Sequence, residues 1–222
     1  MKSAPVMPIL IKCKSTHKPY YLIEKAEIMI DPIAQTDDIF FSNTGLDQDR
    51  SLKIVQSALA GADDGELFLE MRHSEMLAFD DGRLKAASYD QSSGFGLRAI
   101  AGEAHGYAHA GELSEDALRR AAASVGAVTN GYEGTAALAP VGGANRPLYS
   151  DDNPLNATPF DAKVLLLQEI DAFARAADPR VVQVSASLAG SWQAVQIMRA
   201  DGHRAVQCKL HVASAGGFLA RG

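Results

Sequence analysis

Alternating hydrophobic and polar residues predict short strands in two parts of this 222-residue chain. Successive side chains of a strand point to opposite faces, so alternation is typical of a strand with one buried face. In the first part, Asp81-Gly82 predicts a tight hairpin turn, because glycine accepts the positive φ that such turns require. The expected strands of this part are residues 66–71, 75–79, 83–89, 94–101 and 104–110.

The second part repeats the order of the first. Asp201-Gly202 predicts another hairpin turn, and alternation predicts strands at residues 182–188, 192–199 and 204–212. Each part has a helix, two strands, an Asp-Gly turn and a third strand. This shared order is the basis for a hypothesis of an internal helix-plus-three-strand repeat.

Hydrophobic residues at helical spacing predict three helices. One precedes the first part, and the other two lie between the first part and the second. The first begins at Thr44 or Asp47, whose side chains suit an N-cap, and Ser114 caps the second. Thr158-Pro159 begins the third, since proline is favoured at the first helical position. Helices grouped beside antiparallel β-meanders predict an α+β fold.

Composition and charge narrow the class of protein. The formal net charge of −6, from 21 Lys+Arg and 27 Asp+Glu, argues against nucleic-acid binding, which usually requires a basic stripe. Cys13 and Cys208 are too widely spaced for a zinc cluster or a disulfide framework, so we expect reduced thiols. No run approaches the ~18 apolar residues of a membrane span. Residues 1–14 make a poor signal peptide, so we expect a cytoplasmic protein.

Two histidines four residues apart, His105 and His109, are the first candidates for chemistry. On a helix such a pair is typical of a zinc site. Here Gly106 and the surrounding alternation favour a strand or loop, and no Glu follows the first His to act as the base of the zinc-protease pattern. A spacing of four would still put both rings on one face of a strand. We favour a structural role for the pair.

Two further patterns have structural explanations. Residues 94–99 fit the Gly-x-Gly-x-x-Ala form of a dinucleotide-binding loop, but that loop must open a helix and a strand is expected here. Paired carboxylates can act as acid and base, and the acidic candidates are Asp63, Asp64, Asp80 and Asp81. Asp-Asp-Gly, however, is typical of a hairpin turn. The patterns therefore assign no catalytic, cofactor-binding or metal-binding residue.

Several segments in order resemble the N-terminal domain of TldD-type proteins, which belong to the TldD/PmbA family of zinc metalloproteases. The segments are residues 65–70, 80–85, 94–99, 102–109, 182–185 and 196–202. The resemblance covers roughly residues 40–206. It implies a TldD-like N-terminal domain at residues 44–206, with a linker at about residues 129–157.

The resemblance implies an intracellular zinc metallopeptidase that acts on peptides or unfolded proteins and works with a related TldD/PmbA-family subunit. The metal site of the family is a His-Glu-x-x-x-His helix beyond the region present here, and this sequence contains no His-Glu pair. We therefore expect no zinc in this chain and no proteolysis by it alone. The alternative is a non-catalytic module that binds a peptide or a partner through exposed sheet edges.

Both ends depart from the family pattern. Residues 1–43 are expected to be an atypical N-terminal extension, because four prolines interrupt any long element. Residues 207–222 are expected to be an aberrant C-terminal tail, which a shifted reading frame would explain. We expect such a chain to be poorly soluble or to depend on association, because its sheet edges would lack partners.

Overall fold

The protein is built on one antiparallel sheet of five strands, seen in a computed structural model that describes residues 32–131, 134, 153 and 155–220. The spatial order is β3-β2-β1-β4-β5, so β1 is the central strand. The strands are β1 (Asp64–Asp80), β2 (Arg83–Ala101), β3 (Ala104–Ala110), β4 (Val181–Arg199) and β5 (Arg204–Ala220).

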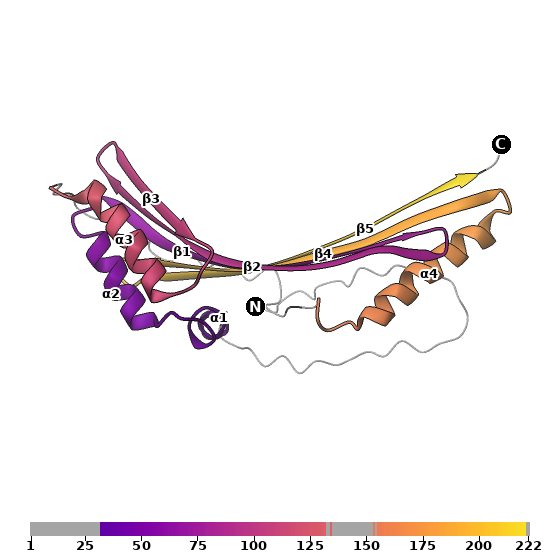
Figure 1. Cartoon of the computed structure of the whole chain (residues 1–222), viewed down its shortest axis with the longest axis horizontal. Coiled ribbons are helices and arrows are strands. Elements are labelled where there is room, and N and C mark those ends of the chain that lie inside the picture. The colour runs from indigo at the N-terminus through magenta and orange to yellow at the C-terminus, as the bar shows by residue number, and fades with distance from the viewer. Residues whose placement is uncertain (1–31, 132–133, 135–152, 154, 221–222) are drawn as a thin grey trace, which may run out of the picture.

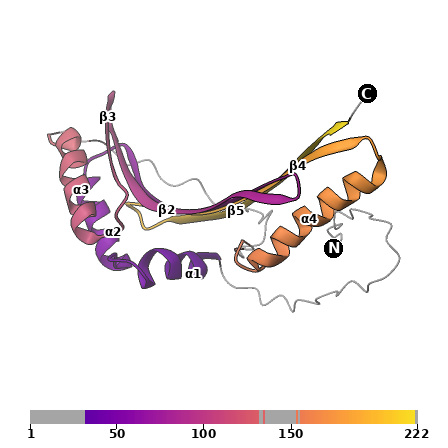
Figure 2. The ribbon, with the colours of Figure 1, turned by 45° about the vertical axis from the view of Figure 1, so that its right-hand side comes forward.

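The helices lie on one face of this sheet (Figures 1 and 2). They are α1 (Pro32–Asp37), the π-helix η1 (Asp38–Ser42), α2 (Gln48–Ala58), α3 (Glu115–Thr129) and α4 (Phe160–Ala177). α2 and α3 pack together at one end of the sheet, and α4 packs on β4 at the other end. The opposite face carries no helix of the described part of the chain. The predicted α+β class is confirmed.

Each of the long strands β1, β2 and β4 joins two strands that the sequence predicted as separate. The predicted strand count is therefore wrong: each part has a helix followed by one long hairpin, and β3 extends the first part. The internal repeat stays a hypothesis. Residues 72–74 were expected to break β1, but they contain no Gly or Pro to turn the chain. Both Asp-Gly turns are confirmed, with φ of 75° at Gly82 and 83° at Gly202.

The predicted helix starts agree with the structure in two cases and differ in the third. The Asp47 side chain accepts a hydrogen bond from the Arg50 backbone N–H at 2.9 Å, and Ser114 accepts one from Ala117 at 3.3 Å. Pro159, rather than Thr158, occupies the cap position of α4, and no side chain caps that helix. A proline ring fixes φ near the helical value without supplying a cap.

The expected domain boundaries fall within continuous structure at both described ends. Phe40, inside the expected extension, is fully buried. β5 runs without a break past position 206 and pairs with β4 as far as Ala220. Residues 1–31 and most of the expected linker lie outside the described residues, so the domain division stays a prediction.

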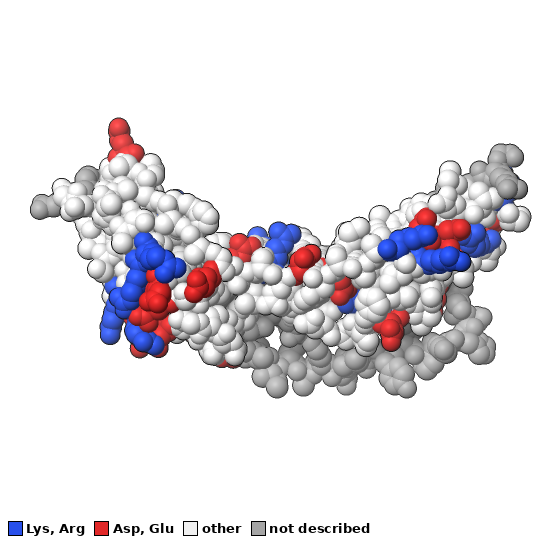
Figure 3. Space-filling view, in the orientation of Figure 1, with Lys and Arg blue, Asp and Glu red and all other residues white. Residues whose placement is uncertain are grey.

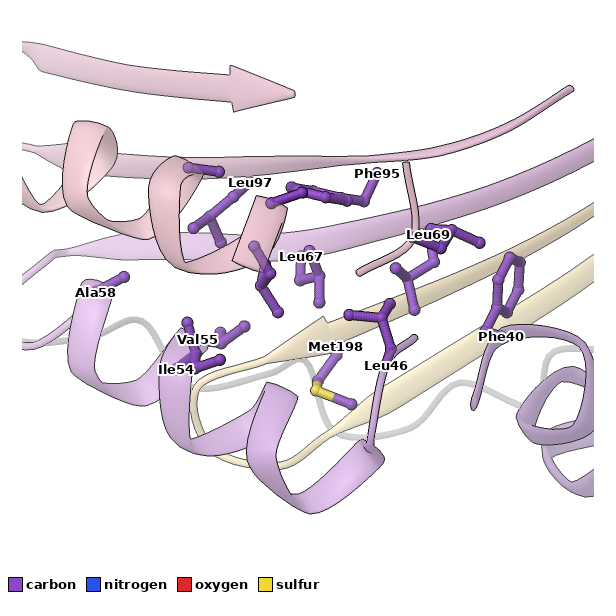
Figure 4. Close-up of a cluster of buried hydrophobic side chains, with 14 of the residues drawn as sticks. Phe40, Leu46, Ile54, Val55, Ala58, Leu67, Leu69, Phe95, Leu97 and Met198 are labelled. Atoms are coloured by element: carbon purple, nitrogen blue, oxygen red, sulfur yellow. The ribbon is translucent and has the colours of Figure 1, made fainter. Parts of the chain in front are cut away.

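Among the described residues, the core consists of two hydrophobic clusters under the helices. The larger lies between α2, α3 and the sheet and includes Val55, Leu67, Leu97 and Met198 (Figure 4). The smaller lies under α4 and consists of Leu77, Phe79, Leu167 and Ala186. Both clusters use odd-numbered positions of β1, so alternation directs one face of this strand to the core along its length.

Polar residues occupy the same face of β1 between the two clusters. Lys163 of α4 is 7% exposed, and its Nζ lies 2.7 Å from the Glu75 carboxylate and 2.6 Å from the Leu155 carbonyl oxygen. The His73 ring lies 5.3 Å from the Trp192 ring, and its Nδ1 accepts a hydrogen bond from the Asn153 amide at 2.8 Å. Burial lowers the pKa of His73 below its ordinary value. We call these five side chains, of His73, Glu75, Asn153, Lys163 and Trp192, the polar joint.

Lys163→Met should lower the free energy of unfolding by about 3 kcal/mol, because the largely buried Glu75 carboxylate would lose its ionic partner. Urea unfolding measures the change. The double variant Lys163→Met/Glu75→Gln should recover most of the loss, since it buries no uncompensated charge. A single variant as stable as the parent would contradict the ion pair's role.

His73 should make the protein less stable in acid. Its folded-state pKa lies below the ordinary 6.5, so the unfolded chain takes up the proton first as pH falls. The stabilisation is present above pH 6.5 and is lost below it. Urea unfolding at about pH 7.5 and about pH 5.5 should show a smaller drop in His73→Gln than in the parent.

The matched control for this pH experiment is His203→Gln, since His203 is exposed in the β4–β5 turn. It should keep the parent's pH dependence. An identical drop in all three proteins would show that burial of His73 is not its source.

Candidate functional site

A trough on the helix-free face of the sheet is the candidate site, and it consists of two hollows that meet at Arg72. The first, of about 370 Å³, lies over β1, β2 and β3. The second, of about 600 Å³, lies over β2, β1, β4 and β5. The first is lined by Phe68, Glu70, Arg72, Gly94, Tyr107 and His109. The second is lined by Arg72, Ser74, Met76, Ser191, His211 and Ala213.

Glycines of β2 form the floor of the first hollow, where a side chain would reduce its depth. A side chain at Gly94 would place Cβ 2.7 Å from the Ala110 carbonyl oxygen, so β3 can approach β2 only over a glycine. At Gly96 a Cβ would lie 2.7 Å from the Tyr107 hydroxyl. Both glycines lie inside β2 and open no helix, so the dinucleotide-loop alternative is wrong.

The edge strand β3 forms one wall of the first hollow. His105, Tyr107 and His109 face the helix-free side with Arg98 and Gly96, their neighbours on β2. The expectation that both histidines share one face is confirmed. The Tyr107 and His109 rings stack with centroids 5.7 Å apart, and Tyr107 is 67% exposed. No cluster of three or more His, Cys, Asp or Glu side chains suited to a metal ion occurs among the described residues.

The four candidate carboxylates do not meet. Asp63 accepts a hydrogen bond from the Gly102 backbone N–H at 2.7 Å, and Asp64 pairs with Arg199 at 2.5 Å. Both lie at the start of β1, whereas Asp80 and Asp81 lie at its far end. The two ends of β1 are too far apart for an acid–base pair between them, and within each neighbouring pair the carboxylates bind different partners.

Asp80 and Asp81 fasten the β1–β2 turn to its neighbours. The Ser185 hydroxyl donates to Asp80 at 2.6 Å and holds the pKa of that carboxyl below its ordinary value, with a further hydrogen bond from Gln183. Asp81 forms an ion pair with Arg175 of α4. The structural explanation of this Asp-Asp-Gly turn is therefore confirmed.

Most charged side chains beside the trough form ion pairs or hydrogen bonds with neighbouring side chains. Glu70 accepts a hydrogen bond from the Gln193 amide at 2.7 Å. Glu66 lies 3.2 Å from Arg98 and 4.0 Å from Arg199. Figure 3 shows groups of mixed sign over α2 and α3 and over α4. Sequence reasoning missed Arg72 and Tyr107, although alternation along β1 and β3 would have placed both on the helix-free face.

The described helices include none that is long and apolar enough to cross a bilayer.

The sequence matches two domain descriptions of one family. Residues 65–129 match the first domain of the PmbA/TldA metallopeptidases, and residues 153–213 match the PmbA/TldA metallopeptidase central domain. Together these matches cover more than half of the chain.

Individual relatives agree with these matches. The chain is 29% identical over 170 residues to the metalloprotease TldD homolog of Buchnera aphidicola, which covers 76% of this chain and 35% of the relative. It is 32% identical over 142 residues to the homolog of Haemophilus influenzae, covering 63% of this chain and 30% of the relative. The chain thus spans about a third of the length of these curated relatives.

A solved structure shares the fold. TldE from Thermococcus kodakarensis superposes with a TM-score of 0.61 at 14% identity, covering 78% of this chain and 40% of TldE. From the two domain matches and the TldD homologs, the resemblance stated from sequence is confirmed: this chain belongs to the TldD/PmbA family and corresponds to its N-terminal region.

Proposed function

We propose that this chain is the substrate-binding N-terminal part of a TldD-like zinc metalloprotease that degrades peptides or unfolded proteins in the cytoplasm. The observation that carries the proposal is the trough, because the two family regions form one sheet with an open, hollowed face. An extended peptide has the shape of such a shallow channel.

The chain itself supplies binding and not bond cleavage in this proposal. A zinc hydrolase needs ligands that hold the metal and a base that activates its water. The sequence contains no His-Glu-x-x-x-His segment, so we assign the zinc of the family to residues outside this chain. Phe68, Gly94 and Ser191 of the trough offer apolar contact, floor space and a hydroxyl to a substrate.

The second candidate function is partner binding through the sheet edges. β3 and β5 are the outer strands, and β5 is 17 residues long. An unpaired edge offers a row of backbone donors and acceptors to another strand. A related TldD/PmbA-family subunit is the partner we propose for this edge.

The purified chain, supplied with equimolar zinc, should not cleave reduced, unfolded casein, although it should bind it. Cleavage is read from fluorescent fragments with and without a chelator, and zinc from elemental analysis. The Haemophilus influenzae homolog serves as the comparison enzyme. Stoichiometric zinc together with chelator-sensitive cleavage by the 222-residue chain would overturn the proposal.

Binding should depend on the trough. Ser191→Trp should weaken casein binding several-fold, because the indole would fill the second hollow. Ser124→Trp is the matched control, since Ser124 is exposed on α3. A different result would favour binding through the sheet edges. Casein binding would then be unchanged in Ser191→Trp, and an added peptide that pairs as a strand with a sheet edge would abolish it.

A further inference from the structure

We propose that the trough selects extended peptides carrying an acidic side chain, whose carboxylate Arg72 binds. This inference rests on the proposed function, since it names the class of peptide that the same surface takes.

Arg72 is an exposed cation at the junction of the two hollows. It lies on the central strand, where its backbone is held by hydrogen-bonded neighbours on both sides. Within the described part of the chain its guanidinium has no ion pair, whereas Arg98 and Arg199 on the same face both pair with Asp64. The positive charge of Arg72 therefore forms no ion pair that stabilises the described part of the fold.

Neither Glu70 nor Asp90, the carboxylates next to Arg72 in the strand pairing, forms an ion pair with it. The Glu70 carboxylate accepts a hydrogen bond from the Gln193 side-chain amide at 2.7 Å. Asp90 faces Ser74 across the β1–β2 pairing and forms no ion pair with Arg72. Among the described residues, the Arg72 guanidinium therefore keeps its hydrogen-bond donors open to an anionic group of a ligand.

Residues around Arg72 suit a carboxylate. The guanidinium is a planar fork that binds both oxygens of a carboxylate at once. Ser92 lies opposite Arg72 on β2, and Gln193 lies opposite it on β4. Ser74 follows it on the same face. The hydroxyls of Ser74 and Ser92 are donors small enough to leave the approach open.

The position of Arg72 favours a side-chain carboxylate over a chain terminus. Hollows continue from it toward His109 on β3 and toward His211 on β5. Five strands spaced about 4.8 Å apart give a trough of roughly 19 Å, which accommodates about six extended residues. Arg72 lies in the middle of that length and would therefore contact the middle of a bound peptide. Away from the C-terminus of a peptide, carboxylates come only from side chains.

The test measures peptide binding by fluorescence anisotropy on the 222-residue chain. The probes are capped, labelled heptapeptides of alternating Val and Thr with a central Glu or a central Gln. A third peptide has the central Gln and an uncapped C-terminus. The Glu peptide should bind roughly fivefold more tightly than either Gln peptide, as expected for a charge-assisted pair at an open site.

Arg72→Gln should abolish this preference, and Arg72→Lys should retain part of it, because the lysine keeps the charge and loses the planar fork. Arg120→Gln is the matched control, since Arg120 is exposed on α3. Thermal melting checks that each variant is folded. If Arg72→Gln is unfolded, a reduced preference in a folded Arg72→Lys supports the proposal and an undiminished preference overturns it.

Three results would overturn the inference: no preference for Glu in the parent, a preference that survives in folded Arg72→Gln, or equal binding of the peptide with a free C-terminus. None requires catalysis. The casein experiment and the peptide experiment can therefore give opposite results. Failure of the proposed function can be told apart from failure of the acidic-peptide preference.

Discussion

The antiparallel pairing of β1 with β4 is the interaction on which the rest of the structure depends. It runs from Glu66 opposite Arg199 to Asp80 opposite Ser185. It joins the region matched to the first family domain with the region matched to the central domain. Each backbone hydrogen bond contributes only about 1 kcal/mol net. The pairing is fixed because a shift of one residue would turn the core side chains of β1 to the helix-free face.

Both faces of the sheet rely on this pairing. On the helix side, it brings Trp192 of β4 next to His73 and completes the polar joint between the two clusters. On the helix-free side, it sets Ser191 opposite Ser74 in the second hollow. A trough that crosses all five strands exists only because the two hairpins form a single surface. Core and candidate site are therefore consequences of the same strand register.

The sequence predicted local features well and long-range ones poorly. Asp47, Ser114 and the two Asp-Gly turns were found because caps and turns depend on a few adjacent residues. The lengths of β1, β2 and β4 were missed, since their polar or small middle residues resemble loop residues until a partner strand pairs with them. The trough could not be predicted, because Arg72, Tyr107 and His211 come together only through strand order, which alternation does not encode.

Hydrogen exchange followed by mass spectrometry tests the central role of the β1–β4 pairing most directly. The account predicts that amides of residues 66–79 and 186–198 exchange in one cooperative step, with the same dependence on denaturant. Exchange of β4 and β5 at low denaturant, while β1 and β2 stay protected, would show two independent hairpins. That result would contradict a single sheet as the basis of the fold and of the trough.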